Sequence, residues 1–89
     1  MTDTIIHDQD KYRFVLRDSG SEVVLRYRPV DPTAVDFIST YTPPELRGRG
    51  LARAVVEAAL AWAAAEGLRV IPTCSYVARV MTENRGNAE

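Results

Sequence analysis

Hydrophobic and polar positions alternate along most of the first half of the chain. Residues Lys11–Arg17 and Glu22–Arg28 each carry an apolar side chain at nearly every second position, and a short loop with Gly20 joins them. Period-two alternation on both sides of a glycine-containing loop predicts an antiparallel β-hairpin. We also expect a short edge strand over Thr4–His7.

A third strand is predicted over Ala34–Thr42. The alternating apolar residues of this segment include Val35 and Phe37, and the alternation extends to Tyr41. The strand is expected to stop at Pro43, because proline has no N–H to donate to a sheet ladder.

The hydrophobic period changes from two to about 3.6 at Leu51. Apolar residues at this spacing predict a helix of about four turns over Leu51–Ala65, with Trp62 in the core. Gly67 is a candidate for the residue that ends the helix. The positions that define the apolar face are Leu51, Val55, Ala58, Trp62 and Ala65.

The apolar run Leu68–Thr73 follows this helix and predicts another strand. A strand–helix–strand order implies that the two strands lie parallel. A short final helix is expected over Tyr76–Met81, and residues 83–89 are expected to be a frayed tail. The predicted fold is therefore α/β (α+β): a mostly antiparallel sheet, one main helix, a parallel strand and a short C-terminal helix.

Composition narrows the class of protein. With 89 residues and 9.9 kDa, the chain forms one domain, residues 1–89. Eleven basic and twelve acidic residues give a net charge of −1, which argues against a nucleic-acid binder.

The chain has one cysteine and one histidine, which excludes an internal disulfide and a metal site built from several cysteines or several histidines. The longest apolar run, Ala58–Ala65, is too short to span a membrane, so we expect a cytoplasmic protein.

The segment that suggests a ligand-binding site is Arg47-Gly48-Arg49-Gly50, between the third predicted strand and the main helix. Its amides and the free N–H groups of the first helical turn can form an anion cradle. Arg53 adds a third positive charge at a helix end that disfavours cations. Spacing alone fits a glycine-rich turn with solvated arginines equally well.

The run Arg47–Ala52 matches the Arg/Gln-x-x-Gly-x-Gly/Ala signature of the GNAT acetyltransferase superfamily, and Pro72-Thr73-Cys74-Ser75-Tyr76 follows at a fitting distance. Together they resemble the small YjdJ-like, GNAT-related N-acetyltransferase domain, over nearly the whole chain. The resemblance implies a minimal GNAT-like fold, acetyl-coenzyme A (acetyl-CoA) as ligand and transfer of acetyl to an amine. The strand end at residues 39–42 would run beside the pantetheine arm. The coenzyme A-binding residues it implies are Thr42, Arg47, Gly48, Arg49, Gly50, Leu51 and Ala52.

The same resemblance suggests catalytic residues. Cys74 could relay the acetyl group or shuttle a proton, or it could be a small buried side chain. Tyr76 could protonate the leaving thiolate, or it could only pack. Glu45 is expected to be a solvated carboxylate rather than a base, and His7 a surface residue.

The acceptor is expected to be an amine on a small molecule or a protein, with no nucleic-acid or membrane partner. Larger GNAT enzymes carry extra elements that shape the acceptor pocket, and this chain lacks them. Its acceptor site is therefore open, completed by a homodimer or another partner, or absent. The alternative function is a non-catalytic acyl-CoA sensor or a protein-interaction module.

Overall fold

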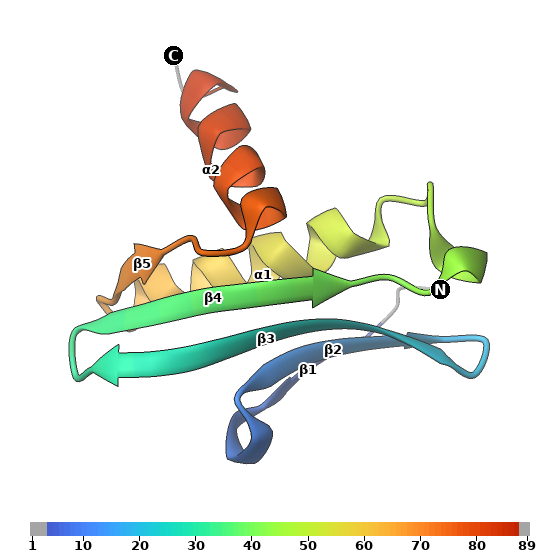
Figure 1. Cartoon of the computed structure of the whole chain (residues 1–89), viewed down its shortest axis with the longest axis horizontal. Helices are drawn as coiled ribbons and strands as arrows, with labels where there is room; N and C mark the ends of the chain where they lie inside the picture. The colour runs from blue at the N-terminus through green and yellow to red at the C-terminus, as the bar shows by residue number, and fades with distance from the viewer. Residues whose placement is uncertain (1–3, 88–89) are drawn as a thin grey trace.

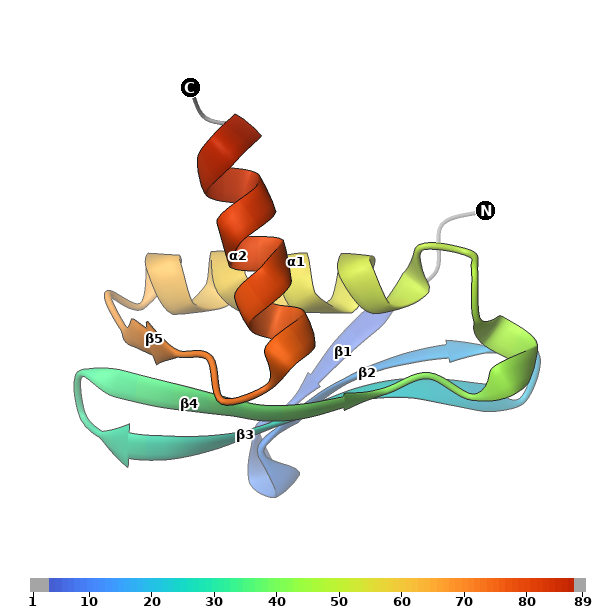
Figure 2. The same cartoon turned by 45° about the horizontal axis from the view of Figure 1, so that its top comes forward.

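Five strands form one sheet in the order β1-β2-β3-β4-β5, and two helices lie on the same face of it (Figures 1 and 2). The computed structural model describes residues 4–87, with side chains for residues 4–84. The first four strands are antiparallel and β5 is parallel to β4, which confirms the predicted fold. The strands are β1 (Ile5–Asp8), β2 (Arg13–Asp18), β3 (Ser21–Asp31), β4 (Ala34–Tyr41) and β5 (Arg69–Ile71).

The predicted hairpin is formed by β2 and β3, and the expected edge strand is β1. Ser19 and Gly20 turn the chain with φ of 55° and 80°, the left-handed geometry that suits a two-residue hairpin loop. The predicted alternation of apolar and polar residues does not extend to Tyr12. A 3₁₀ turn (η1, Gln9–Lys11) precedes β2 and leaves Tyr12 at φ 53°. Tyr12 is consequently 50% exposed and not on the core face of the strand.

Strand β4 contains one extra residue opposite the step from Arg26 to Tyr27 of β3. Tyr27 pairs with Phe37 and Arg26 pairs with Ser39, so Ile38 is a β-bulge. The bulge shifts the alternation by one position. Tyr41, expected on the same face as Phe37, therefore lies on the other face of the sheet and is 56% exposed.

Helix α1 (Leu51–Ala65) has the bounds that the sequence predicts. Its end is a Schellman motif: Gly67 has φ 71° and donates to the carbonyl of Ala64, while Leu68 donates to Ala63. The helix packs on β2 and β3. The buried core between helices and sheet consists of Phe14, Leu16, Val23, Leu25, Tyr27, Val35, Phe37, Leu46, Val55, Val56, Ala59, Ala63, Val77 and Val80.

Helix α2 (Ser75–Asn87) is longer than expected. Residues 83–87, predicted to belong to a frayed tail, are helical, and residues 88–89 lie outside the described part of the chain. Val77 and Val80 anchor the helix in the core, and Arg53 of α1 binds Glu83 and Asn84 further along it. The sequence pattern misses this extension because the contact joins residues about thirty positions apart.

Helices α1 and α2 are both too short or too polar to cross a lipid bilayer.

Candidate functional site

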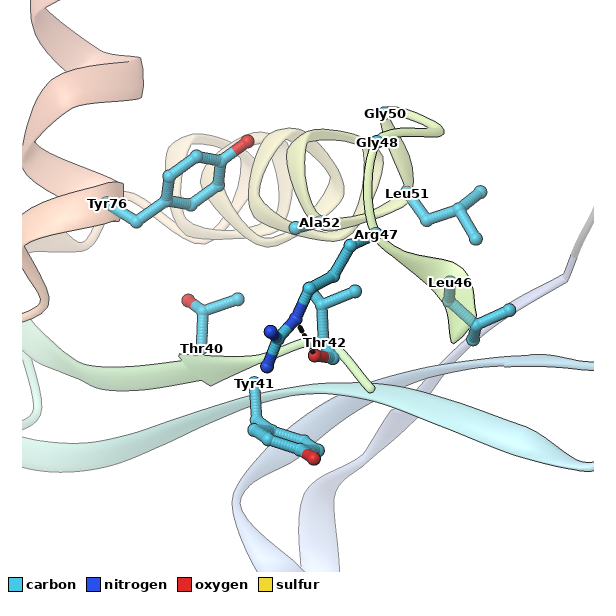
Figure 3. A pocket seen from close by; sticks show the side chains of 10 residues that line it. All are labelled: Thr40, Tyr41, Thr42, Leu46, Arg47, Gly48, Gly50, Leu51, Ala52 and Tyr76. Atoms are coloured by element: carbon cyan, nitrogen blue, oxygen red, sulfur yellow. Dashed lines mark hydrogen bonds between the residues drawn. The ribbon is translucent and has the colours of Figure 1, made fainter. Parts of the chain in front are cut away.

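A cavity of about 510 Å³ lies between the end of β4 and the first turn of α1 (Figure 3). Strand β5 pairs with β4 only as far as Asp36, so the later residues of β4 have no neighbouring strand on this side. Tyr76 of helix α2 lines one side of the cavity. Its lining residues are Thr40, Tyr41, Thr42, Leu46, Arg47, Gly48, Gly50, Leu51, Ala52 and Tyr76.

The loop before α1 is shaped for an anion. A 3₁₀ turn (η2, Pro44–Leu46) fixes the loop through Leu46, which is only 2% exposed. Gly48 and Gly50 then have φ of 79° and 76°, a region that other residues adopt at a cost of about 1–2 kcal/mol. Gly50 begins the helix and no side chain caps it, while the first helical hydrogen bond runs from Ala54 to Gly50. The preceding amides therefore have no acceptor within the helix and can bind an anion.

Arg47 lies across the mouth of this loop. Its Nε donates to the carbonyl oxygen of Thr42 at 2.9 Å, which fixes the guanidinium over the end of β4 (Figure 3). The outer nitrogens of the guanidinium have no hydrogen-bond partner among the described residues, and Arg47 lines the cavity. Arg47 is thus the arginine of this loop that is placed to contact a bound anion.

Arg49 points instead to the β2–β3 turn. Its Nη2 donates to Oδ2 of Asp18 at 2.8 Å. Hydrogen bonding from Ser19, and then the charge of Arg49, hold the pKa of the Asp18 carboxyl below its ordinary value. Ser21 of the same turn donates to Glu45, which lowers the pKa of that carboxyl as well. The two contacts attach the glycine loop to the hairpin.

Arg53, which follows the loop arginines in the sequence, bonds residues of the two helices instead of lining the cavity. Its guanidinium bonds Glu57 at 3.2 Å within α1, and it bonds Glu83 and Asn84 (3.2 Å) on α2. Arg53 does not line the cavity. It joins the two helices because residues 53 and 57 share a helix face that α2 crosses.

Cys74 does not line the cavity itself but contacts a residue that does. Its Sγ is 3.5 Å from Oγ1 of Thr40, which lines the cavity, and its own amide donates to Phe37 of β4. Burial alone would raise the pKa of the thiol. Hydrogen bonds from Thr40 and from the first amides of α2, those of Val77 and Tyr76, outweigh burial and leave that pKa below its ordinary value.

Tyr76 projects into the cavity from the first turn of α2 (Figure 3). The guanidinium of Arg79 lies 5.3 Å from the centre of its ring. The two residues proposed as catalytic, Cys74 and Tyr76, therefore reach the same region from the start of one helix. Glu45 is exposed and does not line the cavity, as expected for a solvated carboxylate.

The expectation of a surface position for His7 is wrong. Its ring stacks on Phe14 at 4.0 Å, meets the edge of Trp62 at 4.7 Å, and its Nε2 lies 2.6 Å from the Tyr27 hydroxyl. Burial, opposed by Asp8, lowers the pKa of the imidazole. Trp62 is partly buried against the core, close to its predicted place. None of the residues of this aromatic cluster lines the cavity at the glycine loop.

Sequence reasoning missed Leu46 and the contact between Thr40 and Cys74. Leu46 has one available signal: it is the lone aliphatic residue between Pro44 and the arginine-glycine repeat. No local sequence pattern predicts the contact between Thr40 and Cys74, because it depends on the bulge at Ile38 and on where α2 begins.

Comparison with known proteins shows which family this chain resembles. Residues 13–89 match the sequence profile of the family described as GCN5-related N-acetyl-transferase. The chain is 36% identical to Protein NATD1 of Bos taurus over 80 residues, which covers 88% of this chain and 71% of that protein. It is 35% identical to Protein NATD1 of Gallus gallus over 80 residues, covering 88% and 73%.

Proposed function

Since the chain belongs to the GCN5-related N-acetyltransferase family, we propose that it binds acetyl-CoA beside α1 and transfers the acetyl group to an amine. One observation carries the proposal. The uncapped N-terminus of α1 follows two glycines with positive φ, and Arg47 lies over the same cavity. Backbone amides and a guanidinium together suit a pyrophosphate.

The residues present fit this ligand. In the proposal, the amides from Gly48 to Ala52 hold the pyrophosphate and Arg47 contacts it from the side. Arg49 adds positive charge at the rim while remaining paired with Asp18. The pantetheine arm follows the unpaired edge of β4 past Thr42 and Thr40, where backbone N–H groups can polarise a thioester carbonyl.

The reaction is an attack by a neutral amine on the thioester. The acyl donor supplies an activated carbonyl carbon. A C–N bond forms, the C–S bond breaks, and the amine loses its proton to solvent. Tyr76 donates its phenolic proton to the departing thiolate and then regains one from solvent. The chain supplies proximity and hydrogen-bond donors, two established sources of rate acceleration.

Cys74 has two roles compatible with its position. As a relay, its thiolate attacks the thioester, coenzyme A leaves with a proton, and the acetyl-Cys74 thioester reacts with the amine. As a proton shuttle, it hands a proton through Thr40 and stays unmodified. The intact mass of the protein after mixing with acetyl-CoA alone distinguishes the two roles. The relay predicts that the mass increases by one acetyl group, whereas the proton shuttle predicts no increase. In the Cys74→Ser variant the increase should be absent.

Chromatography of coenzyme A release tests the proposal, with acetyl-CoA and a panel of primary amines that includes small amines and lysine peptides. We expect amine-dependent release that Tyr76→Phe slows while acetyl-CoA binding is unchanged. Absence of binding would refute the proposal. Binding without release for any amine would favour the acyl-CoA sensor, and release only in the presence of an added protein would identify a partner that completes the acceptor side.

A further inference from the structure

A second cavity, of about 500 Å³, lies at the opposite end of α1. It is formed where the η1 turn, the β3–β4 turn and the last turn of α1 meet. Gly50 and Glu66 delimit α1, whose fifteen residues at about 1.5 Å each separate the two cavities by about 20 Å. The residues that line it are Gln9, Asp10, Tyr12, Tyr27, Pro29, Asp31, Pro32, Ala34, Val35, Trp62, Glu66 and Leu68.

Three aromatic rings make up one wall of this cavity. The ring centres of Tyr12 and Tyr27 are 5.7 Å apart, and those of Tyr27 and Trp62 are 5.3 Å apart, all tilted. Tyr12 is half exposed and Trp62 is partly exposed, so both present ring surface to solvent. Aromatic surface of this kind attracts organic cations, since the ring face carries partial negative charge.

The charged lining is entirely acidic. Asp10, Asp31 and Glu66 border the cavity, and no lysine or arginine lines it. Six of the other seven carboxylates among the described residues form ion pairs, whereas these three form none with a described residue. Thr33 donates twice to one oxygen of Asp31, and Arg69 further lowers the pKa of that carboxyl. Asp10 and Glu66 form no side-chain hydrogen bond with another described residue.

The three carboxylates surround the cavity without converging on one point. Among the described residues, no group of three or more acidic, histidine or cysteine side chains is placed to hold a metal ion. The arrangement therefore suits a cation larger than a metal ion, with apolar carbon to lie on the rings and positive charge to face the rim.

We propose that this cavity binds an alkylammonium group, such as that of a polyamine or of a lysine side chain. The ammonium lies near Glu66 and Asp10 while the adjoining methylenes contact Tyr12 and Trp62. The site is independent of acetyl-CoA binding, because it lies at the other end of α1.

Trp62 is the single tryptophan of the chain, so its fluorescence and its indole N–H resonance report directly on this cavity. We would titrate the full chain, without acetyl-CoA, with spermidine and with a lysine-containing tripeptide blocked at both ends. Octane-1,8-diol, of similar length but uncharged, is the control. A saturable change with either cation and none with the diol is expected. A response to spermidine alone indicates a polyamine site, and a response to the peptide alone indicates a protein lysine.

Two variants localise the effect. Glu66→Gln should weaken binding about threefold, the size of one exposed charge contact, and Tyr12→Leu about threefold through loss of one ring. Glu22→Gln removes the same charge at the far end of β3 and should leave affinity unchanged. Absence of saturable binding in the wild type, or equal weakening by Glu22→Gln, would overturn the proposal.

Discussion

The sulfur of Cys74 lies 3.5 Å from the hydroxyl of Thr40, across 34 positions of sequence. This contact joins the start of α2 to the unpaired end of β4. It places a thiol with a lowered pKa beside the cavity at the glycine loop. The thiol and the glycine loop therefore lie at two sides of the region in which we propose that acetyl-CoA binds.

Alkylation of Cys74 tests this contact directly, since the chain has one cysteine. We expect the iodoacetamide rate to rise with a midpoint below the pKa of about 8.5 of a free cysteine. Thr40→Val removes a hydrogen-bond donor to the thiolate and should move the midpoint up. Thr73→Val, at an exposed neighbouring position, is the control and should not. Equal midpoints for the two variants would show that Thr40 does not act on the thiol.

The arginines of the loop should differ in their effect on acetyl-CoA binding. Arg47→Gln removes a charged donor at the cavity and should weaken binding about tenfold or more. Arg53→Gln should change affinity little, because Arg53 is engaged with Glu57 and Glu83 on the helices. Titration calorimetry of both variants measures the difference, and a larger loss for Arg53→Gln would reverse the assignment.

His7 should make the stability of the fold depend on pH. Its pKa is lowered in the folded protein, chiefly by burial, from the unfolded value of about 6.5. The unfolded chain therefore binds a proton more readily, so the free energy of unfolding should fall as pH drops from about 7.5 to about 5.5. His7→Gln can still accept from Tyr27 but does not titrate, so its stability should vary less over this range. Urea unfolding at several pH values provides the comparison, and equal slopes would contradict it.

Local patterns were enough to predict much of this fold. The bounds of α1 follow from its period of 3.6 and from Gly67, and the β2–β3 hairpin follows from alternation around Gly20. The glycine loop was recognisable because Arg47–Ala52 carries a sequence signature. Each of these signals lies within a few residues of the element that it predicts.

The errors concern contacts between distant parts of the chain. The bulge at Ile38 arises from pairing with β3, so alternation alone put Tyr41 on the wrong face. His7 is partly buried by aromatic side chains of β2, β3 and α1, which a polar N-terminal segment does not reveal. The sequence placed Arg53 with the loop arginines at the start of α1. Its partner Glu83 is thirty residues away, so no local pattern indicates that Arg53 joins the two helices.

The central claim is that the loop at the start of α1 binds acetyl-CoA. Two glycines at opposite ends of the helix test it: Gly50 and Gly67 have φ of 76° and 71°, and a Cβ on either would meet open space. Glutamate at either position therefore costs similar backbone strain and adds the same charge, but only at Gly50 does it face the proposed pyrophosphate site.

Isothermal titration with acetyl-CoA is the measurement, applied to the wild type and to both variants after circular dichroism has shown that they fold. The account predicts saturable one-to-one binding to the wild type and to Gly67→Glu, and none to Gly50→Glu. Absence of binding to the wild type, or equal affinity in all three proteins, would contradict it.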